Sequence, residues 1–364
     1  MSITQNSIKQ HEIAALHELE QMMLAAKENI GESRSELEKS VTNLENCLQQ
    51  IRQKYILDEK QCAMEAFREQ FESGYTWING FLRNVERFGN REALAEPESG
   101  KVWTYTQLND EANRFAHALL RSGLQKGDVV MAQLHNCPEF VFAYLACHKI
   151  GLVFCPVNFR LSAKELSGCM DNSCPKVFLM ESENQENTDM ALEWAKHAPE
   201  IILSTDSQSE HSYEKFADGC PETNPELPWD MYVFDETLRL FTSGTTGRQK
   251  SVCLTSINEV LSAHDVMINF PLSFTDRTMN TTPWFHRGGL HSGGITPTLY
   301  AGGTVVVQRK FQAEQTLDCI EQQGLTFVIG VPNVLELMAE AQQKQPRNLH
   351  SLHGIVTMGS PLER

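Results

Sequence analysis

The sequence predicts an α/β protein with two similar sheet-and-helix layers, preceded by an α-helical extension. From about residue 75, short apolar runs alternate with amphipathic helical patterns, and this alternation occurs twice. Such alternation is typical of parallel sheets covered by helices. The first seventy or so residues are instead rich in Glu, Gln and Lys and nearly free of Pro and Gly. We therefore expect a helical, coiled-coil-like extension over residues 1–74 and an α/β part over residues 75–364.

The extension has apolar residues at heptad spacing, which is the seam of a coiled coil. One seam position is filled by Leu16, Met23, Ile30, Leu37, Leu44 and Ile51, and the complementary one by Ile13, Val41, Leu48 and Tyr55. Gly31, followed by a capping-box pattern at Ser35 and Glu38, predicts a break and a restart. A helical hairpin, a helix that self-associates or binds a partner through residues 13–55, and an amphipathic helix packed on its own chain all fit this pattern.

The first β-α series follows from helix caps and apolar runs. An apolar helical face from Leu108 to Leu120 ends at Gly123, and Pro138 and Gly151 bound the next helix. Ser162 and Glu165 predict a capping box for a third helix. The expected strands cover residues 128–134, 152–157 and 176–180.

A polar, proline-containing stretch over residues 204–230 is expected to be a surface connection between the two series. After it, a strand at 252–254 precedes a helix that we expect Ser256 and Glu259 to cap. The second series then comprises a strand from Thr304, a helix near 313–323, a strand at 326–331, a helix opened by Pro332 and a strand at 354–358.

Composition excludes several classes of partner and site. The chain has 364 residues, 41% of them hydrophobic, and a formal net charge of -16. That charge argues against nucleic-acid or anionic-membrane partners, which are bound through Lys and Arg. Its ten cysteines form no Cys-x-x-Cys pairs, so we expect reduced thiols and no metal ligands of this type. Neither a signal peptide nor a transmembrane run is evident, and we expect a cytoplasmic protein.

The most informative stretch is Thr-Ser-Gly-Thr-Thr-Gly-Arg-Gln-Lys, at residues 242–250. Glycines allow backbone N–H groups to turn toward a ligand, hydroxyls add donors, and a lysine adds a positive charge, so this composition favours a phosphate-binding loop. The candidate ligands are Thr242, Ser243, Gly244, Thr245, Thr246, Gly247 and Lys250. It is not the common P-loop, because Gln249 stands where that motif needs glycine. The alternative is a surface turn rich in Ser, Thr and Gly.

This loop resembles the signature of the acyl-adenylate-forming superfamily, which includes acyl-CoA synthetases, peptide-synthetase adenylation domains and beetle luciferases. The usual proline and glycine around the lysine are replaced by Gln249 and Ser251. The resemblance extends from about residue 78 to the last residue. Residues 104–108, residues 149–158 and the run Phe-Val-Ile-Gly-Val-Pro at 327–332 are similar to further blocks of the family.

Two more blocks carry site residues by this resemblance. Pro-Trp-Phe-His-Arg-Gly-Gly, at 283–289, is similar to the block of CoA-forming members, in which His286 would lie beside the acyl group and gate thiolation. Otherwise, a lone histidine after two aromatic residues is usually a core or edge residue. The glycines that follow allow close ligand approach or a flexible loop. Gly359, Ser360 and Pro361 resemble a turn that borders the adenine.

The resemblance implies a fatty-acid-CoA ligase type of enzyme. A hydrophobic acid, ATP and CoA would be substrates, with Lys250 and Mg²⁺ offsetting phosphate charge. The family's later motifs, with its magnesium-binding glutamate and the lysine of the small C-terminal domain, are not found before Arg364, so we expect a partial domain with impaired catalysis. Two alternatives remain: a non-catalytic interaction protein that uses the N-terminal coil and keeps a remnant nucleotide-binding half, or transfer of the acyl group to a carrier protein.

Overall fold

The computed structural model describes residues 21, 34–242 and 250–360. The chain divides into two compact units, Met1–Gln70 and Phe71–Arg364. A long helix, α2 (Arg34–Gly74), begins in the first unit and ends in the second. On this helix Leu44 and Ile51, seven residues apart, are 49% and 40% exposed. The described part of the extension is therefore helical, with apolar seam residues open to solvent.

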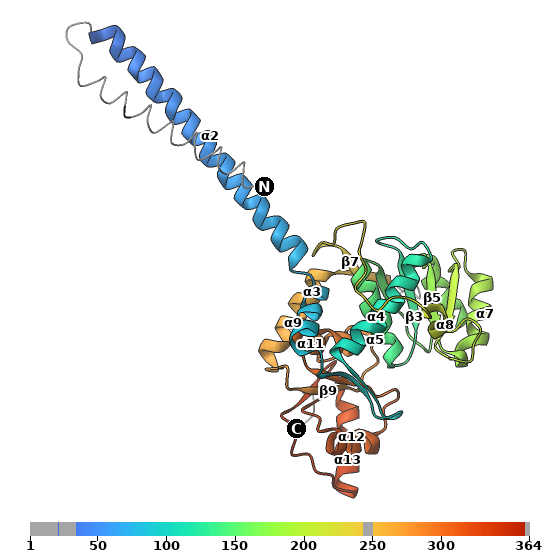
Figure 1. Ribbon diagram of the computed structural model, residues 1–364. Coiled ribbons are helices and arrows are strands. Elements are labelled where there is room, and N and C mark those ends of the chain that lie inside the picture. The colour runs from blue at the N-terminus through green and yellow to red at the C-terminus, as the bar shows by residue number, and fades with distance from the viewer. Residues whose placement is uncertain (1–20, 22–33, 243–249, 361–364) are drawn as a thin grey trace. The chain divides into compact units, whose positions relative to one another are not determined.

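Two six-stranded sheets organise the second unit (Figure 1). Sheet B has the strand order β6-β5-β3-β4-β7-β8, and sheet A has the order β12-β11-β9-β10-β1-β2. Within each sheet five strands are parallel, and the sixth, at one edge, is antiparallel. The two layers expected from the alternating pattern are thus confirmed, with the same edge design in both.

Sheet B follows the first β-α series closely. Its strands are β3 (Val129–Gln133), β4 (Val153–Pro156), β5 (Val177–Met180), β6 (Ile201–Ser204), β7 (Glu236–Thr242) and β8 (Lys250–Thr255). The first four are joined by helices, as parallel neighbours require. By contrast, β7 and β8 form an antiparallel hairpin around residues 243–249.

Sheet A combines strands from distant parts of the chain. Its strands are β1 (Glu92–Glu96), β2 (Lys101–Thr104), β9 (Arg277–Asn280), β10 (Thr304–Val306), β11 (Phe327–Gly330) and β12 (Gly354–Thr357). Leu94 of β1 pairs with Val305 of β10, across more than 200 residues of sequence. The β1–β2 hairpin therefore closes a sheet that the second series builds.

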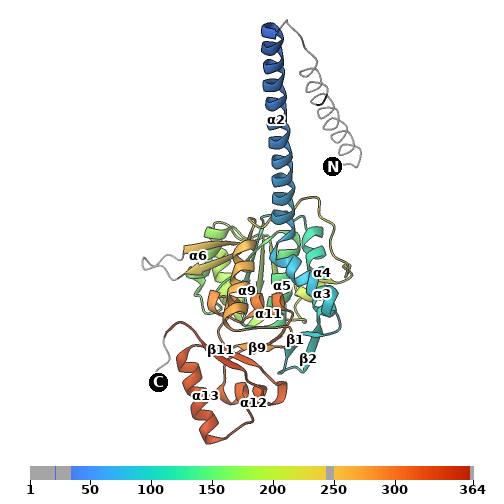
Figure 2. The ribbon, with the colours of Figure 1, turned by 90° about the vertical axis from the view of Figure 1, so that its left-hand side faces the viewer.

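The helices form layers around the two sheets (Figure 2). Between the sheets lie α3 (Trp77–Phe88), α4 (Tyr105–Arg121), α5 (Pro138–Ile150), α9 (Ser256–Asn269) and α11 (Ile295–Ala301), whose apolar side chains share one core with both sheets. The outer face of sheet B packs on α6 (Ala163–Ser173) and α7 (Gln185–Trp194). The outer face of sheet A packs on α12 (Ala313–Gln323) and α13 (Pro332–Lys344).

The central position of α5 explains the most apolar run of the sequence. Twelve of its thirteen residues are buried, because it packs against α3, α4 and β4 within the shared core. Pro138 begins this helix, and Gly151 ends it in the left-handed conformation with φ 73°. Among the described residues, no helix combines the length and the apolar composition needed to cross a bilayer.

Two local expectations need correction. The helix α9 is capped by Thr255 and Asn258, one position before the expected pair, so Glu259 is free to point inward. The stretch 204–230 is more than a surface connection, because it contains the short helix α8 (Tyr213–Ala217). Tyr213 is buried there against Phe115 of α4, with ring centroids 4.7 Å apart. A short 3₁₀ turn, η1 (Ser182–Asn184), also escaped the sequence pattern.

Candidate active site

The β7–β8 hairpin holds the ends of the predicted phosphate loop side by side. Thr242 pairs with Lys250 at the end of the ladder, and the Thr242 hydroxyl donates to the Lys250 carbonyl oxygen at 3.4 Å. Both side chains are exposed at the outer edge of sheet B. The other loop residues, Ser243, Gly244, Thr245, Thr246 and Gly247, lie outside the described residues. The hairpin base therefore presents the Lys250 charge beside the loop.

The turn that carries His286 is anchored by asparagines from both sheets. It connects β9 to the short helix α10 (Arg287–His291). Asn136, which follows β3, donates to the Thr282 carbonyl at 3.2 Å and accepts from the Trp284 backbone N–H at 2.9 Å. The Asn280 side chain donates to the carbonyl of Gly288 at 3.0 Å. Sheet B and sheet A thus both fix the backbone of this turn.

The imidazole of His286 is accessible. The side chain is exposed, and its ring lies 4.3 Å from that of Phe285. Phe285 is buried and meets Phe159 edge to face at 5.7 Å. Partial desolvation lowers the pKa of His286, which favours the neutral imidazole near pH 7. His286 is therefore an accessible, neutral side chain beside an aromatic wall rather than part of the core.

The glycines of this turn serve backbone packing. A Cβ on Gly289 would lie 2.1 Å from the Pro283 carbonyl oxygen, and one on Gly294 would lie 1.9 Å from the Gly289 carbonyl oxygen. No side chain fits at either position. The expectation of a flexible loop or of close ligand approach is thus replaced by a tightly folded turn at these two glycines.

The carboxyl ends of three strands of sheet A meet beside this turn. Thr281, after β9, donates from its backbone N–H to the Ile329 carbonyl of β11 at 2.9 Å. Met358, after β12, donates from its backbone N–H to the Gly330 carbonyl at 3.2 Å. The Met358 sulfur lies only 2.6 Å from where a Cβ of Gly288 would be. Three of the predicted blocks are therefore assembled at one sheet edge, where α/β proteins commonly bind ligands.

The last predicted block is partly described. Gly359 has φ 86°, the left-handed region that favours glycine, and it turns the chain after β12. Ser360 is exposed at this turn, and Pro361 lies outside the described residues.

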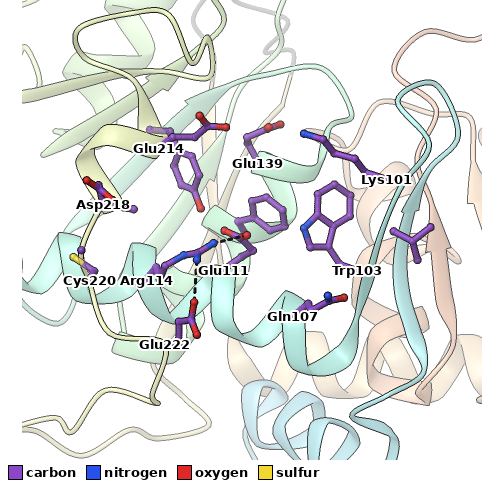
Figure 3. Close-up of a pocket in the computed structure, with 15 residues that line it drawn as sticks. Lys101, Trp103, Gln107, Glu111, Arg114, Glu139, Glu214, Asp218, Cys220 and Glu222 are labelled. Carbon is purple, nitrogen blue, oxygen red and sulfur yellow. Dashed lines mark hydrogen bonds and ion pairs between the residues drawn. The ribbon is translucent and has the colours of Figure 1, made fainter.

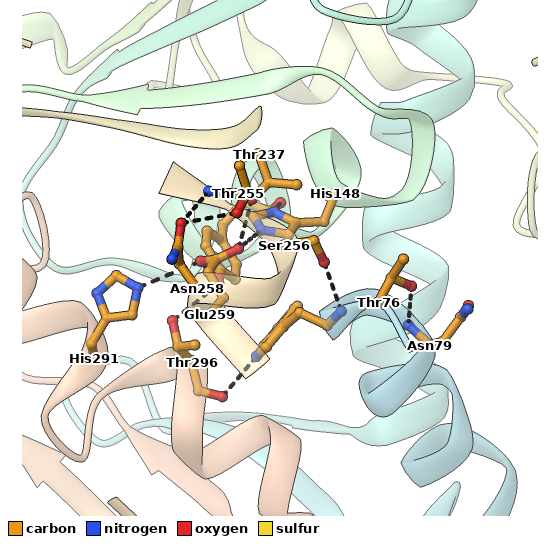
Figure 4. A network of polar contacts seen from close by, with 12 residues as sticks. Thr76, Asn79, His148, Thr237, Thr255, Ser256, Asn258, Glu259, His291 and Thr296 are labelled. Carbon is orange, nitrogen blue, oxygen red and sulfur yellow. Dashed lines mark hydrogen bonds and ion pairs between the residues drawn. The ribbon is translucent and has the colours of Figure 1, made fainter. Parts of the chain in front are cut away.

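A buried polar network lies next to α10, the helix that follows His286 (Figure 4). Its centre is Glu259 of α9, which is fully buried and pairs with His148 of α5. The Glu259 carboxylate also accepts from the hydroxyls of Tyr144 at 2.6 Å and Thr237 at 2.9 Å. His291 of α10 lies 3.7 Å from the same carboxylate. The network therefore connects β7, α5 and α9 to the helix that follows His286.

The charges in this network compensate one another. Burial by itself raises the pKa of Glu259, but the charge and hydrogen bonds of His148 and His291 outweigh it and hold that pKa well below its usual range. The Nδ1 atom of His148 faces the Tyr144 carbonyl at 2.8 Å, and its Nε2 faces Glu259. Each ring nitrogen of His148 therefore faces an oxygen atom of the network.

Sequence reasoning missed this network. Glu259 looked like a capping residue, because a helix start and an acidic residue three positions later form a common pattern. The signal that could have found it was His148, a polar residue inside the most apolar helix of the chain. Such a residue needs a buried partner.

A second set of ion pairs joins the two sheets near the Asn136 anchor. His135 Nδ1 lies 2.6 Å from Glu181 Oε2, and Arg309, after β10, pairs with Glu181 and with Glu183 at 3.1 Å. Within the described residues, His135, Glu181 and Glu183 are also close enough to share a metal ion. The Arg309 guanidinium already supplies positive charge to both carboxylates, so ion pairing accounts for the cluster.

Comparison with known proteins places this arrangement in a family. The sequence model of the AMP-binding enzyme family matches residues 81–364. The chain belongs to the AMP-binding enzyme family. Family membership confirms the resemblance inferred from the glycine-rich loop and its neighbouring blocks.

Relatives in this family act on different acids. The chain is 32% identical over 288 residues to an indoleacetate–CoA ligase of Aromatoleum aromaticum, covering 79% of this chain and 54% of that protein. It is 30% identical over 266 residues to a fatty acid–[acyl-carrier-protein] ligase of Streptomyces coeruleorubidus, covering 72% and 50%. The chain spans about half the length of these curated relatives.

Solved structures share the fold. An anthranilate CoA ligase in complex with anthranoyl-AMP superposes with a TM-score of 0.72 at 21% sequence identity, covering 78% of this chain and 55% of that one. The chain therefore shares its two-sheet fold with this solved CoA ligase.

Proposed function

We propose that this chain provides the ATP- and acid-binding part of an acid–thiol ligase, which activates a hydrophobic carboxylic acid as its adenylate for transfer to CoA. The observation that carries this proposal is the assembly of the His286 turn, Gly330 and Gly359 at the carboxyl edge of sheet A. Family membership and the CoA ligases among the relatives support it.

In the proposed reaction, a carboxylate oxygen attacks the α-phosphorus of ATP, bound as its magnesium complex. The bond from that phosphorus to pyrophosphate breaks, and a thiol later displaces AMP from the acyl carbon. The hairpin loop would hold the β- and γ-phosphates, and Lys250 would offset the charge that develops on pyrophosphate. Its exposed position at the hairpin base is compatible with this role.

His286 would contact the acyl group of the adenylate. Its accessible ring, the neighbouring Phe285 and the fixed backbone of the turn support this placement. A neutral imidazole can approach an acyl phosphate without adding charge to the apolar side of the site. We infer that it gates the acyl pocket when the thiol enters.

For the acid, we infer a hydrophobic class and favour a fatty acid. The relatives named for indoleacetate and for a fatty acid show that the family accommodates both aryl and alkyl groups. Discrimination between these two groups therefore has to be measured on this chain.

The test uses stable mimics of the adenylate, in which a sulfamate replaces the phosphate. Isothermal titration calorimetry would compare adenosine sulfamates that carry a dodecanoyl, an indoleacetyl or an acetyl group. We expect the dodecanoyl compound to bind most tightly, and His286→Ala to weaken it at least tenfold while ATP affinity is unchanged. Weak binding of all three compounds would overturn the proposal, and preference for the indoleacetyl compound would replace the fatty acid with an aryl acid.

A second proposal concerns the extension. We infer that α2 mediates self-association, because Leu44 and Ile51 expose apolar side chains at heptad spacing. The double variant Leu44→Asp, Ile51→Asp should reduce the molar mass measured by light scattering. Its matched control is Asn43→Asp, Gln50→Asp, at exposed polar positions of the same helix. An unchanged mass in both variants would contradict self-association through this seam.

A further inference from the structure

A large cavity lies away from the predicted site residues (Figure 3). It has a volume of about 700 Å³, is open to solvent on one side, and is lined by β2, α4, the start of α5 and the segment that contains α8. Lys101, Trp103, Glu111, Glu139, Tyr213 and Glu222 are among its lining residues. None of the residues expected to bind ATP or the acid lines it, so the proposed ligase reaction leaves this cavity unexplained.

The lining carries an excess of negative charge. Its carboxylates are Glu111, Glu139, Glu214, Asp218 and Glu222, and its basic groups are Lys101 and Arg114. The Arg114 guanidinium is already paired, at 2.5 Å from Glu111 and 3.0 Å from Glu222. Among the lining residues, Lys101 is therefore the basic side chain left to balance the negative charges of Glu139, Glu214 and Asp218. A cation is the ligand that this charge distribution favours.

Glu139 is a partly exposed carboxylate of this lining. It lies in the first turn of α5, where burial raises its pKa above the usual value, while a backbone hydrogen bond, the Cys137 thiol and, least of all, Lys101 lower it. Glu139 is only partly withdrawn from water, and a ligand cation beside its carboxylate would offset the cost of that partial desolvation.

Tyr213 supplies an independent sign of a missing partner. Its side chain is 4% exposed, and among the described residues its hydroxyl has no hydrogen-bond partner. Burial, and to a lesser extent the charges of Glu111 and Glu139, raise the pKa of Tyr213 well above the usual value, so the hydroxyl stays protonated. A buried hydroxyl without a partner is unusual in a folded protein. A ligand N–H in this cavity would satisfy it.

The remaining wall is aromatic. Trp103 meets Phe142 edge to face with centroids 5.5 Å apart, and Phe142 stacks on Tyr213 at 6.3 Å. Aromatic faces attract ammonium groups and also pack against methylene chains. Such walls favour an organic cation over a bare metal ion, which needs closely clustered oxygen ligands.

We propose that this cavity binds a small aliphatic diamine or polyamine. One ammonium group would lie between Glu139 and the Tyr213 hydroxyl, and the alkyl chain would pack on Trp103 and Phe142. A second ammonium group would approach Glu214 or Asp218, which Arg114 leaves uncompensated. Occupancy of this cavity would follow the amine concentration and would not depend on acid activation.

Calorimetry with 1,4-diaminobutane tests the proposal on the full chain. We expect saturable binding of one molecule, no binding of the uncharged 1,4-butanediol, and at least a tenfold loss of affinity in Glu139→Gln. The control Glu193→Gln removes one exposed carboxylate from α7, outside this cavity, and should leave affinity unchanged. Tyr213→Phe removes only the hydroxyl and should weaken binding severalfold.

Several results would overturn the proposal. These are absence of saturable heat, equal losses in Glu139→Gln and Glu193→Gln, or binding of the diol as tight as that of the diamine. Equal losses would show that the amine responds only to the net charge of the protein. Circular dichroism would establish that the variants fold, and Tyr213→Phe carries the test if Glu139→Gln does not. Because ATP is absent from this experiment, failure would not bear on the proposed ligase function.

Discussion

The two sheets have the same design, but they differ in the segment that connects the two antiparallel strands at one edge. In sheet A, β1 and β2 are joined by a four-residue turn, residues 97–100. In sheet B, β7 and β8 are joined by the seven residues 243–249 of the Ser-, Thr- and Gly-rich loop. Both return strands begin with a lysine, Lys101 and Lys250. The edge architecture is therefore shared, and the length and composition of the connection distinguish a closing turn from a candidate ligand loop.

The two sheets also differ in what lies at the carboxyl ends of their strands. In sheet A, the segments after β9, β11 and β12 meet beside the tightly folded turn that carries His286. In sheet B, the segment after β3 supplies Asn136, which supports that turn rather than presenting a ligand group of its own. One sheet thus carries the acid side of the proposed site, and the other carries the phosphate loop and the support.

The largest expected effect comes from the network that connects the sheets. Glu259→Ala leaves His148 and the Tyr144 hydroxyl without their buried acceptor, and removing one partner of a buried pair typically costs about 3–5 kcal/mol. We expect a loss of this size in the free energy of unfolding, measured with urea. Glu314→Ala, an exposed position on α12, is the control and should change little. Similar stability of the two variants would contradict a structural role for the network.

Two glycine-to-alanine substitutions compare the His286 turn beside sheet A with the helix α6, which packs on sheet B. Gly289→Ala should destabilise by roughly 1–3 kcal/mol, because the Cβ meets a backbone carbonyl that cannot move aside. Gly168→Ala, inside α6 with open space around it, should instead stabilise by about 0.5–1 kcal/mol. Urea unfolding reads both changes. A tolerated Gly289→Ala would show that the His286 turn is looser than described.

A smaller effect concerns pH. Because the folded-state pKa of Glu259 is lower than that of an unfolded glutamate, about 4.3, its ionisation stabilises the fold above that pH. This contribution is lost as the pH falls toward the folded-state pKa. Between pH 5 and 4 the wild type should therefore lose more stability than Glu259→Gln, as measured by urea unfolding at each pH. Parallel losses would mean that other carboxylates dominate.

Much of the fold could be predicted from local sequence signals. Helix ends such as Pro138 and Gly151 follow from backbone preferences that act within a few residues. The β1–β10 pairing could not be predicted, because it joins residues far apart in the sequence and no local pattern selects the partner. For the same reason, the sequence indicated the blocks around His286 and Gly359 but not the contacts of Asn136, Asn280 and Glu259 that position the turn.

The most direct test of the central claim compares the lysines of the two hairpins. We expect Lys250→Ala to weaken ATP binding about tenfold, or about 1.4 kcal/mol, because its charge would contact the β- and γ-phosphates. AMP, which lacks these phosphates, should bind both proteins equally, and Lys101→Ala in the sheet A hairpin should change neither affinity. Calorimetry at one salt concentration measures all of these affinities. Unchanged ATP affinity in Lys250→Ala, or an equal loss for AMP, would contradict the assignment of the sheet B hairpin as the polyphosphate-binding loop.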